Sequence, residues 1–199
     1  SGKTTTLNAL SAFIPPNERI ITIEDSLELS FLNRQNWVRL EAKKSSLEEL
    51  VKNSLRMRPD RLVVGEVRGS EAEMLFTAMN VGHRGVLGTL HANSDRDAIT
   101  RLENAPMNVP RALIPLVDLI LVQHRILDRR KGLVKRITQV SEVSRIEDKI
   151  ALNEIYSFDI AADSLNRTSL PSQTREKLAK ALTIPQTEVD AEISKRREL

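Results

Sequence analysis

The first four residues, Ser1-Gly2-Lys3-Thr4, match the end of the phosphate-binding pattern G-x-x-x-x-G-K-[ST]. In this pattern glycine turns backbone N–H groups toward phosphates, the lysine reaches the β- and γ-phosphates, and the hydroxyl binds Mg²⁺. A helix must follow at once, and residues 4–13 predict one that ends before Pro15-Pro16. Half of the pattern is absent, and Gly-Lys-Thr also occurs by chance. The start of the chain therefore indicates a phosphate site without establishing it.

Two carboxylates follow predicted strands. The β-branched run 19–23 ends at Glu24, and the apolar run 62–64 is followed by Gly65 and Glu66. Parallel sheets bind ligands beyond the carboxyl ends of their strands. A carboxylate at the position of Glu24 can orient or deprotonate water, and one at the position of Glu66 can hold a Mg²⁺ shell, often through water. Acids also commonly terminate strands, so a structural role stays open for both.

The third strand-end signal is a histidine. Residues 86–90 predict a strand that ends at His91. A lone histidine is most often a hydrogen-bonded structural side chain, and the same holds for His83 in a predicted turn. No motif surrounds His124. The histidines and acids lack the spacing of zinc ligands, so the sequence disfavours a zinc site.

The elements that must position these residues alternate between strands and helices. Beyond those named above, residues 37–40 predict another strand. Ser46, followed by Glu49, predicts a capping box that opens a helix to about residue 58. The alternation predicts a mostly parallel sheet covered on both faces. Two further helices are expected over residues 70–81 and 94–103.

The pattern changes after Val117. Residues 117–122 predict a short buried strand, whereas residues 133–144 and 149–158 predict antiparallel strands around a turn near 147–148. The tail, about 172–198, predicts two charged helices separated near Pro185. We therefore expect an α/β core over residues 1–125, and a C-terminal β-hairpin and helical subdomain over residues 126–199.

Composition excludes several other classes. The 199 residues contain no cysteine, which excludes disulfides and thiolate metal sites. No apolar run reaches the roughly 18–20 residues that cross a bilayer. Aromatic residues make up 3% and the net charge is +3, which disfavours a nucleic-acid motor of the same core fold.

The order of these signals resembles the secretion ATPases of the type II and type IV systems, also called traffic ATPases. The acid-rich box of that family is similar to residues 21–29, its Walker B region to residues 55–69, and its histidine box to residues 82–85 and 88–94. The resemblance covers about residues 1–123. Arg56-Met57-Arg58-Pro59-Asp60 and residues 106–110 look like the archaeal pilus and archaellum branch, whereas the absence of cysteine disfavours bacterial members with a four-cysteine zinc insertion.

The resemblance implies an α/β fold of the RecA-like, P-loop NTPase type, truncated at its N-terminus. It implies ATP hydrolysis with Mg²⁺ that powers secretion or the assembly of type IV pilus-like filaments. It also implies a homo-hexamer, a polytopic platform protein in the cytoplasmic membrane as partner, and a cytoplasmic location at the face of that membrane. No nucleic-acid partner is expected. A non-hydrolysing scaffold subunit is the remaining alternative, which loss of Glu24 or Glu66 would have favoured; both are present.

The resemblance also implies a role for each candidate residue. Lys3 and Thr4 would contact phosphate and Mg²⁺, together with Ser1, Gly2 and Thr5 in the loop. Glu66 would help to hold the metal, and Glu24 would be the water-activating base. His91 would sense the γ-phosphate, and Arg56 would reach a neighbour's nucleotide. Lys52 shares a helix face with Arg56 and is equally well explained as part of a solvated basic surface. Because the sequence begins inside the loop, we expect the isolated chain to bind ATP weakly and to be unstable.

Overall fold

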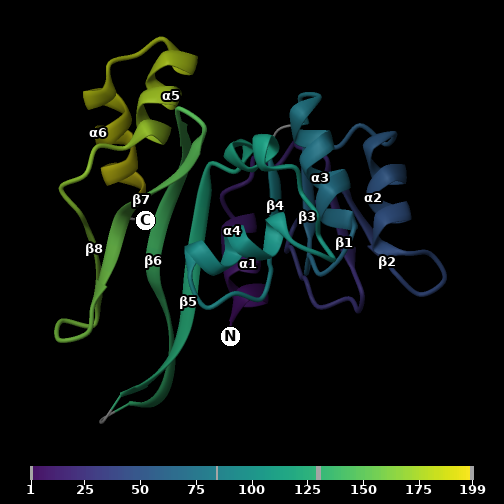
Figure 1. The fold of residues 1–199 in the computed structure, drawn as a ribbon, viewed down its shortest axis with the longest axis horizontal. Helices are drawn as coiled ribbons and strands as arrows, with labels where there is room; N and C mark the ends of the chain where they lie inside the picture. Colours follow the sequence, from purple (N-terminus) through teal and green to yellow (C-terminus); the bar gives the residue numbers. More distant parts are fainter. Residues whose placement is uncertain (1, 84, 129–130, 198–199) are drawn as a thin grey trace. The chain divides into compact units, whose positions relative to one another are not determined.

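The computed structural model of the chain describes residues 2–83, 85–128 and 131–197, without the side chain of Arg197. The chain forms two compact units: residues 1–116 with 122–136, and residues 117–121 with 137–199. Figure 1 shows the helices and strands of both.

A parallel four-stranded sheet forms the centre of the first unit. Its order is β2-β1-β3-β4, and each neighbouring pair is parallel. Ile23 of β1 stands opposite Val64 of β3, so the two strands end side by side at one edge of the sheet. The predicted parallel sheet is confirmed. The strands are β1 (Ile20–Glu24), β2 (Trp37–Glu41), β3 (Arg61–Val64) and β4 (Val86–Gly88).

The helices of this unit follow the predicted order. They are α1 (Lys3–Ser11), α2 (Leu47–Leu55), α3 (Glu71–Asn80) and α4 (Asp95–Glu103), followed by the 3₁₀ helix η1 (Arg111–Leu116).

The start of α2 is confirmed and its end is earlier than predicted. The Ser46 hydroxyl accepts the N–H of Glu49, and the Glu49 carboxylate accepts the N–H of Ser46, which completes the capping box. We predicted that the helix would reach residue 58, but it ends at Leu55. Arg58 has a positive φ of 53° and precedes Pro59, and a residue before proline is disfavoured in the helical region.

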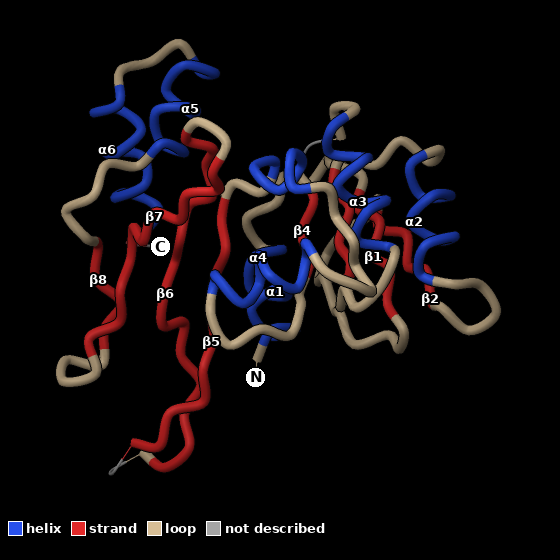
Figure 2. Tube along the Cα trace, viewed as in Figure 1, coloured by secondary structure: helices blue, strands red, loops and turns tan. Residues whose placement is uncertain are grey.

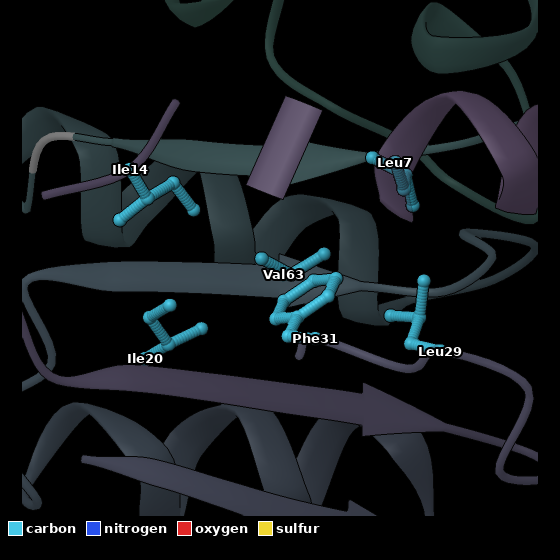
Figure 3. Close-up of a cluster of buried hydrophobic side chains, with 6 residues drawn as sticks. All are labelled: Leu7, Ile14, Ile20, Leu29, Phe31 and Val63. Carbon is cyan, nitrogen blue, oxygen red and sulfur yellow. The ribbon is translucent and has the colours of Figure 1, made fainter. Parts of the chain in front are cut away.

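Strand β1 is buried along its whole length because both faces of the sheet are covered. On one face, Leu7 of α1 and Phe31 join a cluster with Ile20 and Val63 (Figure 3), to which Ile14 and Leu29 also belong. On the other side, α2 contacts β1 and α3. This packing fixes α1 against the strands whose ends carry the acids.

A second sheet has the order β5-β6-β7-β8, with β6–β7 and β7–β8 antiparallel. The predicted pair of antiparallel strands and their turn are confirmed, and β5 and β8 extend them into a larger sheet. Residues 122–136, which include the end of β5 and the start of β6, belong to the first unit. The strands are β5 (Leu119–Asp128), β6 (Gly132–Ile146), β7 (Lys149–Asp159) and β8 (Ser164–Arg167).

We predicted a buried strand over residues 117–122, and the prediction that this strand is buried is wrong. Strand β5 begins at Leu119, and Leu119 and Leu121 are 39% and 38% exposed, whereas Val122 is buried. Alternate side chains of a strand point to opposite faces, and only one face of this stretch is covered.

Two helices complete the second unit, as the sequence predicts. They are α5 (Gln173–Leu182) and α6 (Gln186–Arg197), which pack on each other on either side of Pro185 (Figure 2). The Glu142 carboxylate of β6, only 1% exposed, joins the sheet to the N-terminus of α5. None of the helices in the described ranges is both long and apolar enough to cross a membrane.

Candidate functional site

The site begins at the N-terminus of α1. Gly2 precedes the helix with φ 104°, a left-handed conformation that favours glycine, and its carbonyl accepts the N–H of Thr6 at 3.0 Å. No side chain caps α1, and its first turn contains no acid. The first N–H groups of a helix have no intrahelical acceptor and lie at the positive end of its dipole. This helix start is therefore suited to an external anion.

Lys3, Glu66 and His91 meet beside this helix start. The Lys3 ammonium lies 3.8 Å from Oε1 of Glu66 and 3.3 Å from Nδ1 of His91. Nε2 of His91 lies 2.5 Å from the same Glu66 oxygen. The three side chains come from the start of α1, from just beyond β3 and from just beyond β4. The structure thus joins three of the residues that the sequence singled out.

Glu66 is held in its charged form. Burial by itself raises the pKa of a carboxyl group, but the hydrogen bond from Arg68 and the charges of His91, Arg68 and Lys3 hold the pKa of Glu66 below its usual value. Arg68 also lies 3.5 Å from Asp25, beyond the end of β1.

Glu24 lies at the same sheet edge, but its carboxylate is turned into a buried loop. It is 3% exposed, and Oε2 accepts the N–H groups of Glu28 and Leu29 at 2.8 and 2.7 Å. A Cβ placed on Gly65, at the end of β3, would lie 3.1 Å from Cγ of Glu24, so the two strand ends approach each other closely. Oε1 of Glu24 is buried without a hydrogen-bond partner among the described residues, with Arg39 Nη2 3.9 Å away.

Glu28 links Glu24 to α1. The Thr4 hydroxyl donates to Oε2 of Glu28 at 3.1 Å, and the Glu28 N–H donates to Glu24. Glu28 lies inside the acid-rich box, but no pattern in the sequence singles it out. Thr5, in the first turn of α1, is exposed.

The other predicted residues are not joined to this group. Arg56 is exposed at the C-terminal cap of α2, and no contact with Lys3, Glu66 or His91 is seen among the described residues. Ser1 lies outside the described residues.

Strand β5 and the start of β6 add contacts that the sequence did not predict. The Gln123 amide donates to the Thr6 hydroxyl on α1. Nε2 of His124 lies 3.1 Å from the carbonyl oxygen of Asn93, two residues beyond His91. Lys135 lies against Gly2. Gln123, His124 and Lys135 belong to no phosphate-binding pattern, so only the fold reveals their proximity to α1 and β4.

The donor set suits Mg²⁺. This ion prefers oxygen ligands and is usually bound by one or two carboxylates or hydroxyls together with substrate phosphates and water. The Thr4 hydroxyl at the helix start and the Glu66 carboxylate at the strand end are ligands of that kind. No cluster of three or more His, Cys, Asp or Glu that could form an all-protein cage is found among the described residues.

A parallel sheet, a Gly-Lys-Thr helix start and an acid at the adjoining strand end define the phosphate-loop class of α/β proteins. The family model described as "Type II/IV secretion system protein" matches residues 1–183. The chain therefore belongs to the type II/IV secretion system protein family.

Two curated relatives illustrate its range. The uncharacterised protein MJ1287 of Methanocaldococcus jannaschii is 34% identical over 208 residues, which span 100% of this chain and 76% of that protein. The type IV secretion system protein PtlH of Bordetella pertussis is 38% identical over 144 residues, which span 63% of this chain and 42% of that protein.

Solved structures agree on the fold. The VirB11 ATPase of the Brucella suis type IV secretion system, in complex with sulphate, superposes with a TM-score of 0.63 at 32% identity, over 71% of this chain and 45% of that one. The pilus retraction motor PilT with bound ADP superposes with a TM-score of 0.57 at 25% identity, over 77% of this chain and 44% of that one. The core is therefore RecA-like, as expected. This chain spans less than half of either solved chain.

Proposed function

We propose that the full-length protein hydrolyses ATP to drive a secretion machine or the assembly of a type IV pilus-like filament. The observation that carries this proposal is the meeting of Lys3, Glu66 and His91 beside the uncapped start of α1. The likeness to PilT, solved with ADP, and to the VirB11 ATPase supports it.

The helix start is the proposed phosphate site. Lys3 contacts the β- and γ-phosphates, while Ser1, Gly2 and Thr5 belong to the loop that carries the backbone donors. Lys3 is held by Glu66 and His91, so binding of a phosphate replaces contacts that already order its side chain. Preorganised charge of this kind lowers the cost of stabilising the transition state of phosphoryl transfer.

Thr4 and Glu66 are the proposed Mg²⁺ residues, partly through water. The metal, when bound, neutralises charge on the phosphates. The lowered pKa of Glu66 keeps this carboxyl group in the ionised form that a metal requires. His91, which contacts both Lys3 and Glu66, is suited to sense the γ-phosphate.

Glu24 is the proposed water-activating base. Its Oε2 is engaged by two backbone N–H groups, which leaves Oε1 for a proton. Glu24 ends β1, which pairs with β3, the strand that precedes Glu66, and this position supports the role of a base. Glu28 lies between Glu24 and Thr4.

The family also supports a proposal for the larger assembly. Arg56, exposed at the end of α2, is suited to reach the nucleotide of a neighbouring subunit in a homo-hexamer. The platform partner, the cytoplasmic location at the membrane face and the archaeal pilus or archaellum branch are proposed with it. Three uncharacterised Methanocaldococcus jannaschii relatives favour that branch.

The direct test is Mg-ATP turnover of the full-length Lys3→Ala variant, measured by phosphate release. We expect loss of turnover by at least about a hundredfold, because one preorganised charge at a transition state contributes on that order. Lys44→Ala, which removes an exposed lysine before α2, is the matched control and should retain the wild-type rate. Full activity of Lys3→Ala would contradict the proposal.

A further inference from the structure

The β5–β6 hairpin concentrates the positive charge of the chain. Residues 124–136 contain six Lys or Arg and one Asp, whereas the rest of the chain contains 24 Lys or Arg and 26 Asp or Glu. The hairpin thus has a net charge of +5 and the remainder −2. Two of the six, Arg129 and Arg130, lie outside the described residues. A local concentration of charge of one sign raises the local concentration of ligands of the opposite sign.

One of these cations lies at the phosphate loop. A Cβ placed on Gly2 would lie 3.1 Å from Cδ of Lys135 and 3.8 Å from its Cβ. The aliphatic stem of Lys135 therefore lies against the glycine that precedes α1. The side-chain ammonium is two bonds beyond Cδ, so it lies within a few ångströms of the helix start.

Lys135 differs from Lys3 in what it contacts. Lys3 is engaged by Glu66 and His91. The ammonium of Lys135 has no hydrogen-bond or ion-pair partner within the described part of the chain. A charge held beside a helix N-terminus without a counter-ion is expected to attract an anion.

Strand β5 fixes the hairpin at this place. Gln123 donates to Thr6, one turn into α1, and His124 contacts the carbonyl of Asn93 beyond β4. These contacts tie neighbouring residues of β5 to the two segments that present Lys3 and His91. The position of Lys135 beside Gly2 is therefore maintained by the strand that precedes it in the hairpin.

We propose that Lys135, at the start of β6, is a phosphate-binding residue that adds a basic side chain to the nucleotide site. Its ligand is the polyphosphate of a nucleoside di- or triphosphate, to which Lys135 adds a cation from outside the phosphate loop. This inference rests on the proposed function and extends it to a residue that no phosphate-binding pattern includes.

The test compares Lys135→Ala, Lys135→Arg and Lys131→Ala in the full-length protein, with Mg-ATP turnover and ATP affinity as readouts. Lys131 is an exposed lysine of the same hairpin, so its loss changes the overall charge equally without touching Gly2. We expect Lys135→Ala to raise KM for ATP about tenfold, as loss of one charge-assisted contact does. Lys135→Arg should remain within about threefold of wild type, and Lys131→Ala should match wild type.

The outcomes separate this inference from the proposed function. If Lys3→Ala is inactive and Lys135→Ala has the KM of wild type, the hairpin inference is wrong and the function stands. If Lys135→Ala and Lys131→Ala weaken ATP equally, charge without contact explains the effect, and the inference is also wrong. If Lys3→Ala is fully active, the function itself fails. Unchanged thermal midpoints of the variants establish that the fold is intact.

Discussion

The N-termini of α1 and α5 solve the same electrostatic problem in different ways. At α5 the chain supplies its own anion: Glu142 accepts the N–H groups of Gln173 and Thr174 at 2.8 and 3.1 Å and the hydroxyl of Ser172 at 2.5 Å. At α1 there is no side-chain cap and no acid in the first turn. The cations Lys3 and Lys135 lie beside this helix start, and the nearby acids Glu66 and Glu28 contact the Lys3 ammonium and the Thr4 hydroxyl. A helix start that is satisfied internally is structural, whereas one flanked by cations is prepared for a ligand.

The pKa values of the two carboxylates show the same contrast. Burial alone raises the pKa of Glu142, but the Ser172 hydroxyl and the N–H groups at the start of α5 lower it below its usual value. Burial also raises the pKa of Glu66, but Arg68, His91 and Lys3 lower it below its usual value. The backbone N–H groups that bind Glu142 are fixed in place. The charged side chains around Glu66 can move and exchange partners when a phosphate binds.

The largest effect on stability should come from Glu142→Gln. Gln replaces an acceptor oxygen with an N–H₂ donor that faces the donors of α5, and the change removes charge-assisted hydrogen bonds in a buried place. We expect destabilisation of about 2–3 kcal/mol, seen in the thermal midpoint and as faster hydrogen exchange of the α5 amides. Glu176→Gln, an exposed change on the same helix, should cost less than about 0.5 kcal/mol. Equal midpoints for the two variants would break the comparison.

A smaller effect should follow when α1 is given an anion of its own. Thr5→Glu adds a carboxylate to the exposed first turn. The helix gains a few tenths of a kcal/mol, but ATP should bind about tenfold more weakly to the full-length protein because like charges repel. Calorimetric titration against Thr5→Gln isolates the charge. Equal ATP affinity for both variants would show that the start of α1 is not the phosphate site.

The smallest expected effect is on how the free energy of unfolding depends on pH. Glu66 and Glu142 have lowered pKa values in the folded state. Their contribution to stability is therefore complete above the unfolded pKa of about 4.3 and is lost as pH falls through the folded pKa. Urea unfolding should give a free energy that declines below about pH 4.5. The decline should be shallower in Glu142→Gln, and parallel curves would contradict the role of Glu142.

Much of this architecture could be predicted because local signals agreed with the fold. Alternation of strands and helices predicted the parallel sheet, and the Ser46 and Glu49 spacing predicted the capping box. Parallel strands end at one edge of a sheet, which explains why Glu66 and His91, beyond the neighbouring strands β3 and β4, lie together.

Other features of the fold and the site could not be predicted from the sequence, for physical reasons. Gln123 and Thr6 are 117 positions apart, and no local pattern joins them. Leu119 and Leu121 sit in an apolar run, but hydrophobicity alone does not tell whether both faces of a strand are covered. Glu24 ends its strand as predicted, yet the direction of its carboxylate is set by the turn at Glu28.

Mg-ATP turnover of Glu66→Gln and Glu142→Gln in the full-length protein, per mole of folded enzyme, tests most directly whether the group of Lys3, Glu66 and His91 is catalytic. Both variants neutralise a carboxylate with a lowered pKa, but only Glu66 lies beside Lys3 and His91. We predict that Glu66→Gln lowers turnover by at least about a hundredfold, with a smaller drop in thermal midpoint than Glu142→Gln. We predict that Glu142→Gln lowers the midpoint while folded molecules keep the wild-type rate. Wild-type turnover in Glu66→Gln would contradict a role for Glu66 in ATP hydrolysis.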